Sequence, residues 1–181
     1  MKRRPLILAL LLTVTAIAIP AYAALQSYGV SQVRFKVAGP AGMTIKGKSD
    51  ELKAREHDGV LIIDVSLAHL KTGIELRDKH LRGYLNTNKF PTATLQVARN
   101  ALQLPANNKM TETKAKGRLT LHGKTREIPF SYRANNRDNQ YRVQGRTKID
   151  IRDFGIDVPC YLGVCTKPDV EIDVRFHLRD R

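Results

Sequence analysis

The chain has 181 residues, a formal net charge of +14 and no tryptophan. This length suits one domain that buries a hydrophobic core without a metal or many disulfides. So basic a chain would ordinarily suggest a nucleic-acid partner, but the N-terminal segment predicts export and argues against that interpretation.

Residues 1–23 have the three parts of a secretory signal peptide. Cationic residues at 2–4 precede an apolar run at 6–19, and Ala-Tyr-Ala at 21–23 forms a small-x-small cleavage site. An uncleaved membrane anchor is the disfavoured alternative, because the run is short for a span. Cleavage leaves residues 24–181, which are 158 residues with a net charge of +11 once the three cationic residues are removed. In the periplasm, anionic lipid head groups and pyrophosphates are the expected partners, and a generally basic soluble surface is the alternative.

Alternation of apolar and polar residues predicts about eight strands joined by short turns. The segment 60–67 is nearly all apolar and is predicted to be a strand buried on both faces, whereas the charged segment 51–58 is predicted to be a solvated loop. Gly123-Lys124 lies where a tight hairpin is needed, and Pro129 suggests a sheet edge or a bulge. The predicted strands lie at 28–37, 43–48, 60–67, 94–97, 114–122, 126–132, 141–152 and 170–179.

One short helix is predicted around residues 75–85, between the third and fourth strands. Ile74, Leu81, Tyr84 and Leu85 can share one helical face. Asp78 lies early in the helix, where a negative charge suits the helix dipole, and a structural, capping role is favoured for it. Gly83 is expected to fray the helix, and Pro91 prevents it from continuing.

Cys160 and Cys165 are the only cysteines, and an oxidising compartment favours their pairing. The Cys-x4-Cys spacing differs from the redox Cys-x-x-Cys motif, so a structural disulfide is predicted. Such a small ring adds roughly 2 kcal/mol of stability in the chain-entropy model.

The predicted strands can close into a barrel that either packs solid or holds one small ligand. Several candidate inward residues are small, which favours unfilled volume and a bound guest, although small residues can also simply fit the taper of a packed barrel. These small residues are Ala115, Gly117, Gly145 and Thr147.

Two motifs give the chain a resemblance to a known family. Arg77-Asp-Lys-His-Leu-Arg82 is followed by Lys89-Phe-Pro-Thr-Ala93, and Gly117-Arg-Leu-Thr-Leu-His-Gly-Lys-Thr-Arg126 lies further along. Together they resemble the corresponding stretches of the YceI-like periplasmic proteins, which are polyisoprenoid-binding domains with a lipocalin-like barrel. The Cys160–Cys165 loop is not a general feature of that family.

The resemblance implies an all-β fold, an eight-stranded antiparallel lipocalin-like barrel with the helix at 75–85 inserted. It also implies an apolar lumen that holds the tail of a long-chain isoprenoid such as a polyprenyl phosphate or a quinone, while the polar head stays at the mouth. No other cofactor is required. Candidate residues at the mouth are Arg77, Lys79, His80 and Arg82. Candidate lumen residues are Phe35, Ile45, Leu81, Leu85, Phe90, Leu95, Leu119, Phe130, Val174 and Phe176.

No catalytic or metal site is predicted. The five histidines show no ligand spacing, and His122, before a hairpin glycine, suits a structural hydrogen bond. A hydrolase of lipidic substrates would need a nucleophile motif that the chain lacks. A stress-related envelope interaction module with a solid barrel is the remaining alternative to a lipid carrier. An anionic membrane surface and a homodimer are left open as further partners.

Overall fold

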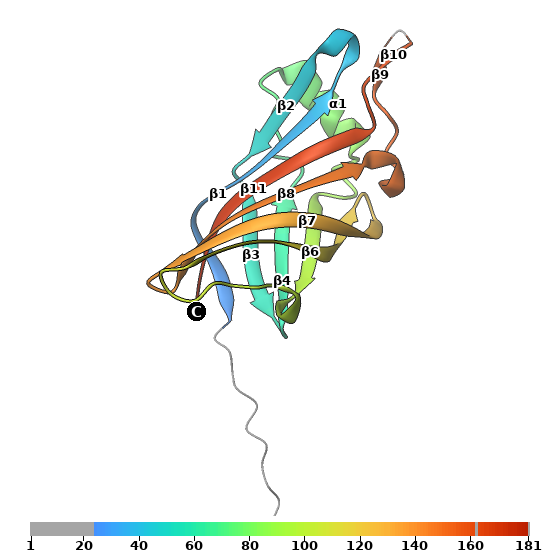
Figure 1. Cartoon of the computed structure of the whole chain (residues 1–181). Helices are drawn as coiled ribbons and strands as arrows, with labels where there is room; N and C mark the ends of the chain where they lie inside the picture. Colours follow the sequence, from blue (N-terminus) through green and yellow to red (C-terminus); the bar gives the residue numbers. More distant parts are fainter. Residues whose placement is uncertain (1–23, 162, 181) are drawn as a thin grey trace, which may run out of the picture.

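A computed structural model describes residues 24–161 and 163–180, so the predicted signal peptide lies outside the described residues. The chain forms strands almost throughout, with one α-helix and three short 3-10 helices (Figure 1). The strands are β1 (Leu25–Ala38), β2 (Thr44–Ser49), β3 (Leu52–His57), β4 (Val60–Ser66), β5 (Thr92–Ala98), β6 (Met110–Leu121), β7 (Lys124–Arg137), β8 (Gln140–Asp150), β9 (Cys160–Tyr161), β10 (Val164–Cys165) and β11 (Asp169–Asp180). The helices are η1 (Pro40–Gly42), α1 (Glu75–Tyr84), η2 (Arg99–Ala101) and η3 (Ile151–Phe154).

The main sheet closes on itself and confirms the predicted barrel. Its strand order is β11-β8-β7-β6-β5-β4-β3-β1-β2, all antiparallel, and β11 also pairs with β1. β2 and β3 together occupy one strand position beside β1. β2 pairs with the second half of β1, and β3 pairs with its beginning. Counting them as one gives the eight strands of the barrel.

Two sequence-based predictions fail in the first half of the barrel. The segment 51–58, expected to be a loop, contains β3, because Leu52 and Ala54 alternate inward while charged neighbours face solvent. The strand β4 is not buried on both faces. Leu61 and Ile63 are buried in the barrel, but outward-facing Asp64 is only half-buried and forms an ion pair with an arginine of β3.

The predicted helix is present as α1 and ends within one residue of Gly83. It connects β4 to β5 and lies at one end of the barrel, away from the C-terminus (Figure 1). Leu81, Tyr84 and Leu85 pack against the core, as the helical face predicted. Ile74 does not share that face: it is the residue that precedes the helix and is half exposed.

The β6–β7 hairpin turns one residue earlier than predicted, through His122 and Gly123. Both residues have positive φ, 51° and 75°, as a two-residue turn of the primed type requires. Pro129 lies in β7 just before the β7–β8 ladder, which begins at Ser131. The missing N–H of this proline therefore costs no ladder hydrogen bond, in agreement with the expected sheet edge.

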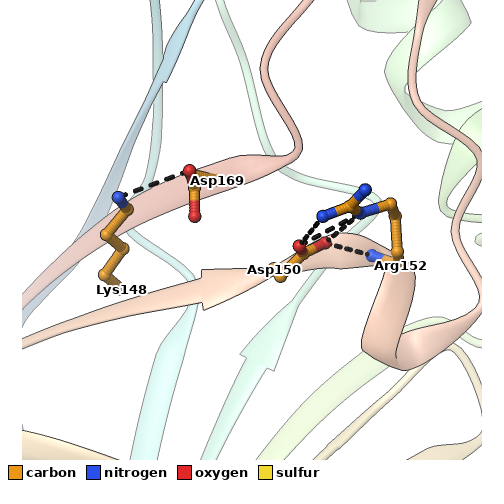
Figure 2. Close-up of polar contacts among 4 residues, drawn as sticks. All are labelled: Lys148, Asp150, Arg152 and Asp169. Atoms are coloured by element: carbon orange, nitrogen blue, oxygen red, sulfur yellow. Dashed lines mark hydrogen bonds and ion pairs between the residues drawn. The ribbon is translucent and has the colours of Figure 1, made fainter.

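Polar contacts fix the end of β8 and the start of β11 near α1 (Figure 2). The Asp150 carboxylate accepts from the backbone N–H of Arg152 at 2.9 Å and from its guanidinium, and Lys148 pairs with Asp169 at 3.4 Å. Asp150 thereby caps η3, and the bonds to Arg152 hold the pKa of this carboxyl below its usual range. These contacts hold both ends of the segment that connects β8 to β11.

That segment forms a small separate hairpin from β9 and β10. Cys160 and Cys165 lie opposite one another in it and are joined by a disulfide, as predicted. The backbone N–H of Lys167 donates to the carbonyl of Ala38 at 2.7 Å, which ties the hairpin base to the end of β1. Among the described residues, no helix combines the length and apolar character needed to cross a membrane.

Candidate functional site

The barrel encloses a large apolar cavity. Its volume is about 1090 Å³, at the upper limit of the 300–1,000 Å³ that is usual for small-molecule sites. Inward side chains of every strand of the main sheet except β3 contribute to its wall, since alternate residues of each strand face the interior. The apolar lining includes Val33, Phe35, Ile45, Leu61, Ile63, Val65, Leu95, Val97, Leu119, Ile128, Phe130, Val143, Ile149, Ile172, Val174, Phe176 and Leu178.

Only some of the small inward residues account for this volume. Gly145 and Thr147 line the cavity, and so does Ala93. Gly117 has another role: a Cβ there would lie 2.9 Å from the carbonyl oxygen of Gln96, so this glycine allows β5 and β6 to approach closely. The prediction that Gly117 leaves space in the lumen is therefore wrong, and Ala115 packs against the core without lining the cavity.

A loop between β5 and β6 closes one end of the cavity. These strands pair through only three residue pairs, so most of the edge of β6 that faces β5 is unpaired. Leu102 and Leu104 of the loop line the cavity. The Tyr132 hydroxyl, from β7, accepts from the backbone N–H of Gln103 at 2.6 Å. Asn136 is almost fully buried and its amide donates to the carbonyl of Pro105 at 3.0 Å. This end is therefore held shut by hydrogen bonds.

The other end, which we call the mouth, carries most of the polar lining. It is framed by α1, by η1 with the start of β2, and by the β9–β10 hairpin, which lie at the same end in Figure 1. The polar and charged residues that line the cavity here are Thr72, Arg77, Lys79, His80, Asn86, His122, Asp157 and Thr166. An amphiphile could therefore place an apolar tail inside and a polar head between these groups.

Asp78 fixes the position of α1 at the mouth. Its buried carboxylate accepts two hydrogen bonds from Thr72, from the hydroxyl at 2.6 Å and the backbone N–H at 2.7 Å. These bonds hold the pKa of Asp78 below its usual range, chiefly through the hydroxyl; Arg82 and Arg77 add a smaller effect in the same direction, and burial opposes it. The structural role expected for Asp78 is thus present, although it braces the preceding loop and does not cap the helix start.

The structure brings most of the predicted site residues together. All ten predicted lumen residues except Phe90 line the cavity, and Arg77, Lys79 and His80 lie at its mouth. Phe90 instead packs outside, with its ring 4.9 Å from that of His122, because the chain after α1 turns it toward the β6–β7 hairpin. Arg82 lies on α1 but does not line the cavity. The ring of His122 contacts the carbonyl of Phe154 at 3.3 Å, which is the structural bond expected for it.

Other lining residues had no clear signal in the sequence. Asp157 and Thr166 come from irregular segments, and only the tertiary structure brings them near α1. Leu102 and Leu104 do alternate in the sequence, a pattern that could have indicated an inward-facing segment. Met43 and Val164, also in the lining, are exposed residues of turns and short strands. In the described ranges, 24–161 and 163–180, no three metal-ligating side chains cluster.

A closed antiparallel barrel with one open end and an apolar interior defines a lipocalin-like binding protein. The chain belongs to the YceI-like family, because the model of the YceI-like domain matches residues 24–178. Curated relatives include UPF0312 proteins of Vibrio cholerae, which are 28% identical over 122 residues. That match covers 63% of this chain, and the chain spans 60% of the length of these relatives.

Solved structures share the fold. A polyisoprenoid binding domain from Saccharophagus degradans, implicated in plant cell wall breakdown, has a TM-score of 0.73 at 18% identity, covering 88% of this chain and 100% of that one. BcnA of Burkholderia cenocepacia has a TM-score of 0.65 at 15% identity, over 81% and 95% of the two chains. The YceI protein of Campylobacter jejuni has a TM-score of 0.57 at 18% identity, over 74% and 83%. At these identities the similarity shows the fold.

Proposed function

We propose that this protein is an exported lipid-binding protein that holds a long-chain isoprenoid, of polyprenyl phosphate or quinone type, in its barrel. The observation that carries the proposal is the distribution of polarity in the cavity: the lining is mostly apolar, and its charged groups other than Arg146 of β8 are gathered at the mouth. The polyisoprenoid binding domain from Saccharophagus degradans, with the same fold, supports the choice of lipid. A cavity of about 1090 Å³ argues against the solid barrel of an interaction module.

The tail supplies most of the affinity. Each methylene transferred from water to the lumen contributes about 0.8 kcal/mol, so a few isoprene units outweigh the cost of association. The head group stays at the mouth, because a charged or quinonoid head would lose its hydration inside without finding partners. Arg77, Lys79 and His80 line the mouth, and on this proposal they donate hydrogen bonds to the head group. The protein binds and carries; it does not catalyse a reaction.

Two features support a periplasmic location. The N-terminal sequence has the form of a cleavable signal, and the disulfide between Cys160 and Cys165 suits an oxidising compartment. In that compartment the ligand is expected to come from an anionic membrane surface.

Extraction of the natively purified protein with organic solvent, followed by mass spectrometry, tests the proposal. Wild-type protein should release a lipid built of repeated five-carbon units. The Ala93→Trp variant, with its bulk in the lumen, should release much less, whereas Ala98→Trp on the exposed face of the same strand should release as much as wild type. Equal yields from the two variants, or no lipid from wild type, would contradict the proposal. A diacyl phospholipid would contradict the lipid class.

A further inference from the structure

Exposed apolar side chains gather around the mouth. Of the six large hydrophobic residues that the described part of the chain leaves exposed, four lie on segments that frame the mouth. We call this set the apolar rim: Met43 and Val164, which are 58% and 52% exposed, and Ile74 and Leu76 at the start of α1, which are 50% and 63% exposed. An exposed set of this kind marks a contact surface when it is continuous with a binding site.

The rim is continuous with the cavity. Met43 and Val164 line the cavity and are at the same time more than half exposed, on two of the framing segments. A lipid tail that leaves the lumen through the mouth therefore passes directly from apolar interior to apolar rim. This continuity favours an apolar phase beyond the rim, since a tail entering water there would lose the free energy of its burial.

A stripe of basic residues runs beside the rim on the outer face of β1, β2 and the loop before α1. Lys36 lies opposite Lys46, Arg34 opposite Lys48, and Lys48 bridges to Lys71 across the backbone. All five are exposed, and none forms an ion pair within the described residues. On the other side of β1, Glu171 lies opposite Lys36, and Asp173 lies opposite Arg34 but is engaged by Arg146 at 2.8 Å.

Like charges directly opposite one another in a sheet destabilise the fold, and the carboxylates of β11 face only Lys36 and Arg34, so folding does not explain the lysines of β2 and of the loop. A partner that carries negative charge in a plane would offset the repulsion. Anionic lipid head groups provide such a plane, and each lysine near an anionic bilayer contributes roughly 1 kcal/mol of attraction. The same surface offers hydrocarbon just below the head groups for exposed apolar side chains.

We propose that the protein docks mouth-first on an anionic bilayer, with the apolar rim inserted below the head groups and the basic stripe against them. The inference rests on the proposed lipid-binding function and adds the face through which the ligand enters and leaves. It places the lumen directly over the membrane, so that a tail can move between the two without crossing water.

Flotation of the full mature protein with vesicles tests the electrostatic part. Vesicles of phosphatidylglycerol and phosphatidylethanolamine should bind it at low salt, and vesicles of phosphatidylcholine should bind it far less. The triple variant Lys46→Gln, Lys48→Gln and Lys71→Gln should bind the anionic vesicles about 100-fold more weakly. The matched control removes three exposed lysines from other places, Lys53→Gln, Lys109→Gln and Lys114→Gln. Equal weakening by both sets would overturn the proposed face.

A pair of methionines tests the apolar part. Met43 and Met110 are both 58% exposed, but Met110 begins β6 at the closed end of the barrel. Met43→Ser should weaken vesicle binding about tenfold, because it removes a side chain that inserts into hydrocarbon, and Met110→Ser should leave binding unchanged. Equal binding by the two variants would overturn insertion of the rim.

Further measurements separate this proposal from the proposed function. Leu76→Ser, on the rim but outside the cavity lining, should weaken vesicle binding and leave uptake of an isoprenoid from detergent solution unchanged, while Ala93→Trp should lose uptake and still bind vesicles. If the wild type takes up no isoprenoid but binds vesicles in a way that depends on Met43, the docking proposal is supported and the proposed function is refuted. A dimer in light scattering that Met43→Ser dissociates would overturn the proposal and assign the rim to a second copy of the chain.

Discussion

At the scale of single residues, the mouth depends on a buried carboxylate. Asp78 lies in the Arg-Asp-x-His-Leu motif, between two residues that face the mouth, yet it points to Thr72 and not to the ligand space. Its two short hydrogen bonds fix the loop that leads into α1, and through it the neighbouring Arg77 and Lys79. The motif therefore combines a residue that holds the helix with residues available to a head group.

Replacement of Asp78 should reveal this role in stability and in its pH dependence. Asp78→Asn weakens two charge-assisted hydrogen bonds and should lower the free energy of unfolding by about 1–3 kcal/mol at pH 7. Because the folded-state pKa is below the unfolded value of about 3.9, the wild type holds this stabilisation above pH 4 and loses it as the pH falls through the folded pKa. Urea unfolding should therefore show the difference between the two proteins shrinking as the pH falls through the folded-state pKa of Asp78.

The exposed Glu75 in the first turn of the same helix is the control. Glu75→Gln should change the unfolding free energy by less than about 0.5 kcal/mol. A difference between wild type and Asp78→Asn that stays constant from pH 7 to the acid range would contradict the hydrogen-bonded, ionised role of Asp78.

At the scale of elements, the β6–β7 hairpin and the segment after α1 stabilise one another. Gly123 turns the chain at φ 75°, and a Cβ on it would lie 2.6 Å from the ring of Phe90. Phe90 in turn packs on the ring of His122, whose Nδ1 contacts the carbonyl of Phe154. The two motifs that carry the family resemblance thus meet in space, which explains why a histidine, a glycine and a phenylalanine outside the lumen belong to them.

A comparison of two glycines separates backbone strain from this contact. Gly59 also has positive φ, 70°, but a Cβ there would meet nothing within 4 Å. Gly59→Ala should cost about 1 kcal/mol through strain alone. Gly123→Ala should cost more, roughly 2–4 kcal/mol, because Phe90 must also move. Thermal or urea unfolding measures both, and equal losses would show that the Phe90 contact has no energetic weight.

At the scale of the whole molecule, closure of the sheet produces the binding space. Pairing of β11 with β1 joins the first and last strands of the chain, so the lumen exists only when the complete domain is folded. Hydrogen bonds from the β5–β6 loop close one end. The other end is framed by α1, by η1 with the start of β2, and by the β9–β10 hairpin. A hollow core gives up packing contacts that a guest can restore.

Bound lipid should therefore stabilise the whole domain. Delipidated protein should melt several degrees below the loaded form, since a ligand at 100 times its Kd adds about 2.7 kcal/mol to the native state. The melting temperature of Ala93→Trp should not respond to added isoprenoid. Differential scanning calorimetry measures both, and identical melting of loaded and delipidated wild type would contradict a guest held in the lumen.

Much of the site was predictable because it lies on regular strands. Alternation assigned Phe35, Leu95, Leu119, Val174 and Phe176 to the inward face, and the structure confirms it. The prediction failed where local pattern and tertiary contact disagree. Charges on the outer face of β3 concealed its inward Leu52 and Ala54, and Phe90 follows the turn after α1 out of the lumen.

The sequence by itself determined most of the strands, the inserted helix, the disulfide pair and the family, because side-chain periodicity and short motifs are local properties. Only the tertiary structure decided that the barrel is hollow, where its mouth lies and which charges face one another around it. Gly117 and Gly145 illustrate the reason: a Cβ on Gly117 would lie 2.9 Å from the carbonyl oxygen of Gln96 and one on Gly145 would lie 2.9 Å from the Val174 side chain, yet only Gly145 lines the cavity. Whether a small residue leaves a cavity depends on how closely strands far away in the sequence approach it, and no local sequence pattern determines that distance.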